Sequence, residues 1–168
     1  MQPPVSRPVK PLRPRSGWRR YLRLWLLCVV VPSAAGAFDL EGHRGARGLA
    51  PENTLAAFTR ALAIGVTTLE TDLAVTRDDV VVIAHDPYLN PDLTRDAAGR
   101  WLAAKGPSIR SLTLAQLRAY ELGRTNPASK LAAQFPEQVA SDGQRFPKLA
   151  EVLALGSRAP VRFNLETK

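Results

Sequence analysis

The alternation of hydrophobic and polar positions predicts strands separated by helices along most of the chain. One helix is predicted to begin at Asn53 or Thr54, either of which can cap it, and to end at Gly65. Its apolar residues recur at helical spacing, namely Leu55, Phe58, Ala61 and Leu62. These positions give the helix one apolar face, which we expect to pack on a sheet.

Four segments have the pattern of β-strands: 38–42, 66–76, 80–84 and 161–168. The third is a continuous apolar run rich in β-branched residues, which is typical of a strand buried on both faces in a parallel sheet. The last alternates strictly, so that one of its faces is polar: Arg162, Asn164, Glu166 and Lys168.

Two further helices are predicted, from a capping box at Thr113 to about Leu122 and from Pro147 to Gly156. Residues 88–111 and 123–146 show no periodicity and are expected to be irregular. Strands that alternate with helices indicate an α/β fold with a parallel sheet.

The chain carries a net charge of +8, but this charge is concentrated in the first 37 residues. That segment holds seven of the 23 Lys and Arg residues and none of the 15 Asp and Glu residues, so the other 131 residues have a net charge of +1. A body so close to neutral argues against nucleic acid as a partner.

Residues 1–37 have the three parts of a secretory signal peptide: a basic segment, an apolar run from Leu24 to Val31, and the small residues Ala35-Gly36-Ala37. Cleavage is expected after Ala37, which places the mature protein in the periplasm or outside the cell. The apolar run is short for a membrane span, although an uncleaved anchor is the alternative. Cleavage would remove Cys28, the single cysteine, so the mature protein would have no disulfide. Cleavage would also remove the apolar run, so we expect no stable membrane span in the mature protein.

The segment from Glu41 to Thr54 combines a histidine, two arginines and three glycines. Glycine permits positive φ and close approach of the backbone to a ligand, and a cationic loop that leads into a helix suits an anion such as phosphate. The alternative is a tight turn whose histidine has only a structural role.

Glu70 and Asp72 lie on one face of the predicted strand 66–76, with their Cα atoms roughly 7 Å apart. A bound divalent cation would offset the cost of burying both carboxylates, and oxygen ligands favour Mg²⁺ or Ca²⁺. Glu166 lies on the polar face of the last strand in the same way. For each strand the alternative is an acidic face exposed to water.

His43 and His85 are the only two histidines, and each follows a predicted strand beside a turn. Ligands of parallel α/β folds bind at the carboxyl ends of strands. Two histidines can act as general base and general acid, while a cation and basic side chains stabilise charge on phosphoryl oxygens. The combination points to metal-assisted cleavage of a phosphate ester.

These residues fall in motifs that resemble those of the glycerophosphodiester phosphodiesterases. The matching segments run in the family's order from residue 41 to the end of the chain: His43-Arg44-Gly45, Pro51-Glu52-Asn53-Thr54, Glu70-Thr71-Asp72, Thr76-Arg77-Asp78, His85-Asp86, Leu112-Thr113-Leu114, Pro147-Lys148-Leu149 and Asn164-Leu165-Glu166-Thr167-Lys168.

The resemblance implies a TIM barrel that hydrolyses glycerophosphodiesters to glycerol 3-phosphate and an alcohol, in lipid and glycerol metabolism. It implies specific roles for the site residues: His43 and His85 as the acid/base pair, Glu70, Asp72 and Glu166 as ligands of one divalent cation (Ca²⁺ or Mg²⁺), Arg44 and Lys168 as phosphate contacts, and Glu52 and Asn53 as supports. We therefore expect the three carboxylates to converge on one point.

Two features depart from the family pattern. Asp79 stands where the family usually has glycine, and residues 38–168 are too few for a barrel of about 250 residues. We expect roughly the first three barrel strands, and a chain that is inactive by itself. The alternatives are a phospholipase-D-like phosphodiesterase that acts on intact lipid, and a truncated remnant without catalytic activity.

Overall fold

The computed structural model describes residues 38–157 and 159–167. The signal peptide predicted for residues 1–37 and the phosphate contact predicted for Lys168 lie outside this part of the chain. Contacts divide the chain into two units, 1–38 and 39–168, and the fold below is that of the second unit.

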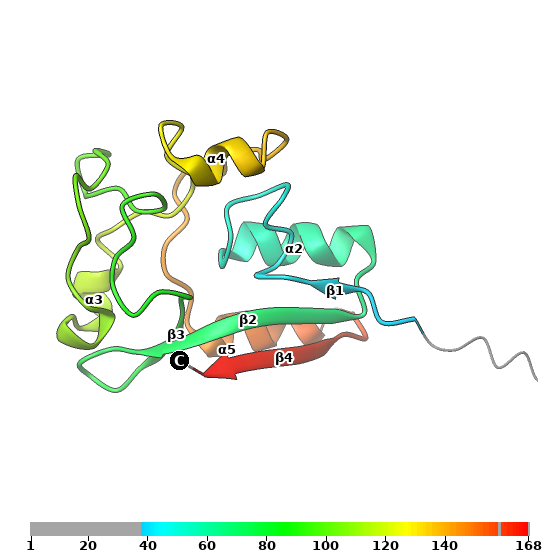
Figure 1. Ribbon diagram of the computed structural model, residues 1–168. Helices are drawn as coiled ribbons and strands as arrows, with labels where there is room; N and C mark the ends of the chain where they lie inside the picture. The colour runs from blue at the N-terminus through cyan, green and yellow to red at the C-terminus, as the bar shows by residue number, and fades with distance from the viewer. Residues whose placement is uncertain (1–37, 158, 168) are drawn as a thin grey trace, which may run out of the picture. The chain divides into compact units, whose positions relative to one another are not determined.

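A four-stranded sheet forms the centre of this unit (Figure 1). Strand β2 (Thr68–Val75) is flanked by β1 (Glu41–Gly42) and by β4 (Arg162–Thr167), and it runs parallel to both. The order β1–β2–β4 confirms the expected parallel arrangement of three strands, although β1 is shorter than the predicted segment 38–42. The result is an α/β protein with a partial parallel sheet.

Strand β3 (Val81–Ile83) runs antiparallel to β2, so the prediction that it belongs to a parallel sheet was wrong. The reason is the connection: Thr76 N–H donates to the Val80 carbonyl across a loop of three residues, and parallel neighbours need a crossover of a dozen or more. Burial on both faces is confirmed, because Val82 and Ile83 belong to two different apolar clusters.

Helix α2 (Leu55–Ile64) begins after its N-cap Thr54 and ends at Gly65, as predicted. The Thr54 hydroxyl accepts a hydrogen bond from Ala57 N–H, and Gly65 adopts a φ of 92° that favours glycine. Helix α2 and helix α5 (Leu149–Leu153) pack on one face of the sheet. Their shared apolar cluster is buried: Phe58, Ala61, Leu69, Ile83, Val152 and Leu155.

Glu70 and Asp72 of β2 are paired with Asn164 and Glu166 of β4, and by the two-residue period of a strand these four side chains lie on the opposite face of the sheet. Between β3 and α5, the chain from residue 84 to residue 148 forms a second cluster around Leu89, Ile109, Leu117 and Phe146. This segment contains η1 (Ile109–Ser111), α3 (Leu114–Leu117) and α4 (Lys130–Gln134), and η2 (Ala154–Ser157) follows α5.

Two helix predictions in this region need correction. The capping box at Thr113 is present, but α3 ends at Leu117 rather than near Leu122. Helix α4 lies inside the stretch 123–146 that was expected to be irregular. None of its five residues is buried, so it has no apolar periodicity that the sequence could reveal. Among the described residues, no helix has the length and apolar character needed to cross a membrane.

Candidate active site

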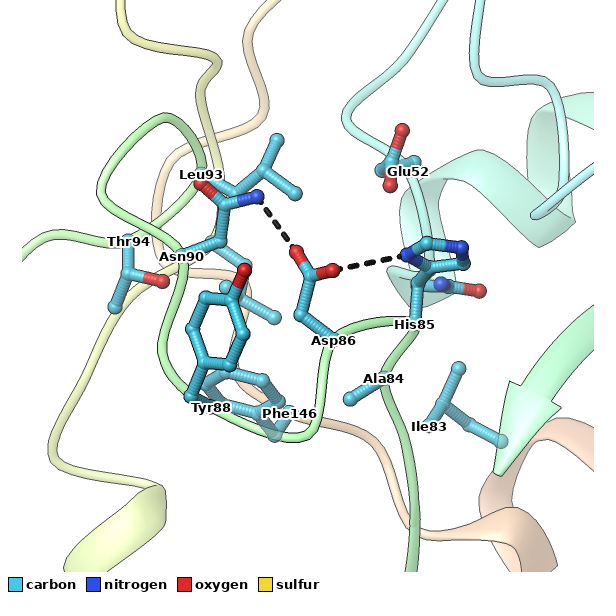
Figure 2. Close-up of a pocket in the computed structure, with 12 residues that line it drawn as sticks. Glu52, Ile83, Ala84, His85, Asp86, Tyr88, Asn90, Leu93, Thr94 and Phe146 are labelled. Carbon is cyan, nitrogen blue, oxygen red and sulfur yellow. Dashed lines mark hydrogen bonds and ion pairs between the residues drawn. The ribbon is translucent and has the colours of Figure 1, made fainter. Parts of the chain in front are cut away.

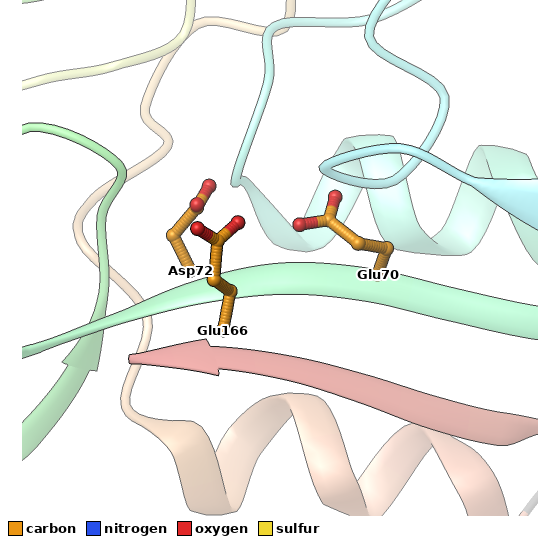
Figure 3. Close-up of side chains that lie close together, drawn as sticks. All are labelled: Glu70, Asp72 and Glu166. Carbon is orange, nitrogen blue, oxygen red and sulfur yellow. The ribbon is translucent and has the colours of Figure 1, made fainter. Parts of the chain in front are cut away.

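Three carboxylates gather on the polar face of the sheet (Figure 3). Glu70 and Asp72 project from β2, and Glu166 projects from β4, where it is paired in register with Asp72. One carboxylate oxygen from each residue lies within 4.8 Å of the others. The structure therefore brings together the three residues that were expected to converge.

Burial makes this cluster costly for negative charge. Asp72 is 1% exposed and Glu70 is 7% exposed, whereas Glu166 is exposed. Burial raises the pKa of Glu70, the charge of Asp72 adds to the rise, and a hydrogen bond from Arg44 N–H opposes it. Three oxygen donors at this spacing fit a hard divalent cation, whose charge would offset the repulsion.

The glycine-rich loop places His43 and Arg44 beside Glu70. The Arg44 N–H donates to Glu70 Oε2 at 2.7 Å, and His43 Nε2 lies 3.9 Å from the same oxygen. Arg44 has a positive φ of 51°, which is rare for this residue type and is typical of functional loops. At Gly45 an added Cβ would lie 2.7 Å from the backbone of Ala57, so only glycine fits against α2.

Glu52 holds two arginines of this loop. Its carboxylate accepts from Arg44 Nη1 at 2.7 Å and pairs with Arg47 Nη2 at 2.9 Å, and Arg47 also lies over the ring of Phe135 at 4.9 Å. The Arg44 guanidinium extends further, with Nε 3.3 Å from Asp72 Oδ2. Arg44 thus links the acidic cluster to Glu52, a contact that fits the supporting role expected of Glu52.

Asn53 connects the loop to β2. Its Nδ2 donates to Asp72 Oδ2 at 3.2 Å, and its Oδ1 accepts from the Thr71 hydroxyl at 3.0 Å. The backbone adopts a φ of 56°, which asparagine tolerates better than most residues. Asn53 is therefore placed to orient Asp72.

His85 enters the site because β3 is antiparallel. Residue Leu73 pairs with Ile83, and Ala84 N–H donates to the Asp72 carbonyl, so the chain returns towards Asp72 just before His85. His85 lines a small cavity of about 30 Å³ with Glu52, Asn53 and Asp86 (Figure 2). The prediction that His85 lies at the carboxyl end of a parallel strand was therefore wrong, because His85 follows the antiparallel strand β3 of this hairpin.

Asp86, which contacts His85, and Asn90, which contacts Asp86, were not identified as site residues from the sequence. His85 Nδ1 lies 3.1 Å from Asp86 Oδ1, and Asn90 Nδ2 donates to Asp86 Oδ2 at 2.6 Å. The adjacency of His85 and Asp86 was visible in the sequence, but Asn90 lies in a loop whose course no periodicity predicts. On β4, Asn164 Nδ2 donates to Glu41 Oε2 at 3.2 Å across β2, another polar contact on the carboxylate face.

The fold and the site define an α/β protein with a carboxylate cluster, a histidine and a cationic loop on one face of its sheet. The chain belongs to the glycerophosphoryl diester phosphodiesterase family, whose profile matches residues 43–168. A glycerophosphodiester phosphodiesterase from Caldanaerobacter subterraneus subsp. tengcongensis is 31% identical over 126 residues, which are 75% of this chain and 43% of that protein.

Solved structures agree with this assignment. A Silicibacter pomeroyi protein described as a candidate glycerophosphoryl diester phosphodiesterase matches with a TM-score of 0.74 and 37% identity, over 77% of this chain and 45% of that one. An Oleispira antarctica phosphodiesterase, solved with the product sn-glycerol-3-phosphate, matches with a TM-score of 0.56 and 27% identity, over 78% and 44% of the two chains. The chain therefore spans less than half the length of these relatives.

Proposed function

We propose that the protein hydrolyses glycerophosphodiesters to glycerol 3-phosphate and an alcohol, within a TIM barrel to which this chain contributes three strands. The observation that carries the proposal is the cluster of Glu70, Asp72 and Glu166, whose oxygens lie within 4.8 Å of one another beside His43. Membership of the family and the product bound to the Oleispira antarctica relative support the choice of substrate.

Glu70, Asp72 and Glu166 would hold one divalent cation, Ca²⁺ or Mg²⁺, which when bound supplies positive charge for the phosphoryl oxygens. Asn53 and Arg44 orient these carboxylates through their contacts with Asp72 and Glu70.

In this proposal His43 and His85 move the protons. One imidazole removes a proton from the attacking hydroxyl or water, and the other protonates the leaving alkoxide. His43 is largely exposed and lies at the edge of the carboxylate cluster, whereas His85 faces the cavity lined by Glu52 and Asn53. Arg44 and Lys168 would contact the phosphate, with Arg44 held in place by Glu52.

The proposal is tested with glycerophosphocholine as substrate, in a chain that spans the full length of the relatives. We expect release of glycerol 3-phosphate that stops when a chelator is added and resumes with Ca²⁺ or Mg²⁺. Release of choline from lysophosphatidylcholine instead would indicate the phospholipase-D-like alternative. Unchanged turnover in the chelator would contradict the proposal.

We also propose that residues 38–168 alone have little or no activity, because a catalytic site must be held within tight limits and this chain supplies three strands of the barrel. Chelator-sensitive turnover by purified 38–168 would contradict this.

Export through the segment 1–37 is a further part of the proposal. Exported protein should begin at Phe38, which N-terminal sequencing would establish, whereas exported protein that begins at Met1 would count against it.

A further inference from the structure

Asp86 makes two hydrogen bonds, one with each oxygen of its carboxylate (Figure 2). Oδ1 lies 3.1 Å from His85 Nδ1, and Oδ2 accepts from Asn90 Nδ2 at 2.6 Å. Asn90 is itself fixed, because its Oδ1 accepts from Asp92 N–H at 2.8 Å. The amide group of Asn90 therefore has one orientation, with its nitrogen directed at Asp86.

The segment that carries Asp86 and Asn90 is held from outside by backbone hydrogen bonds. Ile109 N–H donates to the Pro87 carbonyl, and Leu89 pairs with Pro107 and Gly106. Leu89 is fully buried in the second apolar cluster. Asp86 thus projects from a segment anchored on both sides of it by β3 and by Leu89, which limits its movement relative to His85.

An ionised carboxylate can only accept hydrogen bonds. The ring nitrogen that faces Asp86 must therefore carry a proton, which makes the neutral form of His85 the Nδ1–H tautomer. In that tautomer Nε2 has a free lone pair, and Figure 2 shows this nitrogen on the side of the ring away from Asp86. Nε2 is then the atom that can exchange a proton with a ligand.

We propose that Asp86 is a positioning residue that fixes the tautomer and orientation of His85, and that Asn90 holds Asp86 in place for this purpose. The proposal rests on the proposed function, in which His85 transfers a proton. It assigns that transfer to Nε2, and it makes the hydrogen-bond chain Asn90–Asp86–His85 part of the acid/base machinery. A carboxylate that faces Nδ1 also stabilises the imidazolium that forms when Nε2 is protonated.

The test is the tautomer of His85, read from long-range ¹H–¹⁵N spectra of the full 168-residue chain labelled with ¹⁵N. The spectra are recorded at a pH of about 8.5, which is about two units above the ordinary histidine pKa. The chain has only two histidines, so His43 serves as an internal reference. We expect wild-type His85 to show the Nδ1–H tautomer, and Asp86→Ala to convert it into a mixture of both tautomers. Asn90→Ala should shift His85 in the same direction by a smaller amount.

The matched control is Asp92→Ala, which removes a carboxylate from the same segment and leaves the His85 contacts intact. It should leave the His85 spectrum unchanged. A wild-type His85 in the Nε2–H form overturns the proposal. This result needs no variant, so the proposal can be tested even if Asp86→Ala does not fold. An Asp86→Ala spectrum identical to that of the wild type also overturns it.

The tautomer is read without substrate, so the two proposals fail separately. An Nδ1–H His85, together with a chain of the relatives' full length that cannot hydrolyse glycerophosphocholine, contradicts the proposed function and supports the hydrogen-bond chain. A phosphodiesterase that needs His85 but holds it as the Nε2–H tautomer contradicts the role of Asp86 alone.

Discussion

Asp72 and Glu166 lie side by side in register on parallel strands, although 94 residues of sequence separate them. With Glu70 they form a cluster whose acidic groups lie within 4.8 Å of one another. The sheet therefore concentrates negative charge at one point, and the consequence is a site that should respond to cations.

The first prediction concerns cation binding. Adding Ca²⁺ or Mg²⁺ should raise the thermal midpoint, because a ligand that binds only the folded state stabilises it, by about 2.7 kcal/mol at 100 times the Kd. Asp72→Asn should abolish most of this effect. Glu137→Gln, which changes an exposed carboxylate outside the cluster, should keep it. Equal stabilisation of the wild type and Asp72→Asn in calorimetry would contradict the assignment.

The second prediction concerns the two histidines. In a chain that spans the full length of the relatives, His43→Ala or His85→Ala should each lower kcat by roughly 10²–10⁴-fold, the usual contribution of general acid–base catalysis. The double variant should lose far less than the product of the two, because the residues act as a unit. Steady-state kinetics check this, and the pH–rate profile should be bell-shaped. Normal turnover by His43→Ala would refute the pair.

The third prediction concerns Glu52, which is 6% exposed and pairs with two arginines. Glu52→Gln removes the charge that Arg44 and Arg47 share and leaves Arg44 paired with Asp72, and it should lower the free energy of unfolding by about 3 kcal/mol. Urea unfolding measures the loss. Glu137→Gln is the control and should change the value by less than about 0.5 kcal/mol. A similar small change for Glu52→Gln would mean that the pairs contribute little.

The fourth prediction concerns Asp79 in the hairpin loop between β2 and β3. Its φ is 61°, a left-handed backbone conformation that favours glycine, which is the residue that the family resemblance led us to expect there. Asp79→Gly should be more stable than Asp79→Ala by about 1 kcal/mol. Both variants remove the ion pair with Arg110, but only the alanine side chain destabilises the left-handed backbone conformation. Equal midpoints in urea would show that the loop adapts.

The fifth prediction concerns pH. Hydrogen bonds from Arg124 and then Arg95 hold the pKa of Asp142 well below its usual range. A depressed pKa in the folded state means that the stabilisation is present above the ordinary carboxyl pKa of about 3.9 and is lost as the pH falls through the folded value. Asp142→Asn should therefore be less stable than wild type at pH 7.

The difference between Asp142→Asn and wild type should shrink as the pH is lowered below about 4, and it should also shrink in high salt, because Asp142 is exposed. Urea midpoints at both pH values and at two salt concentrations measure this. A difference that stays constant with pH would show that the arginine contacts do not set the stability.

Much of this site could be predicted because the strand period and the capping rules act locally. Thr54 and Gly65 bound α2 as expected, and the two-residue period placed Glu70 and Asp72 on one face. The family motifs added Glu166, whose pairing with Asp72 depends on a register that no local pattern contains.

What could not be predicted depends on tertiary contacts. The antiparallel course of β3 follows from the short loop that precedes it. The sequence contains this loop, but the apolar run 80–84 favoured a parallel strand and led to the wrong prediction. The contacts of Asp86 with Asn90 and of Glu52 with Arg47 arise from loops without periodicity, where a side chain's partner is set by packing. Helix α4 carries no buried residue, so its pattern resembles that of a loop.

The pairing of β2 with its three neighbours also sets an order of assembly. Leu73 and Ile83 of the hairpin are 10 residues apart, Gly42 and Leu69 are 27 apart, and Asp72 and Glu166 are 94 apart. Each doubling of a closed loop costs about 0.6 kcal/mol of chain entropy, so docking β4 costs about 2 kcal/mol more than closing the hairpin. The β2–β3 hairpin and β1 should therefore form before β4 arrives. Glu70 and Asp72 already share β2, so what β4 adds at the end of folding is the repulsion between Glu166 and this pair. A cation present at that stage should therefore speed the final docking step far more than the earlier ones.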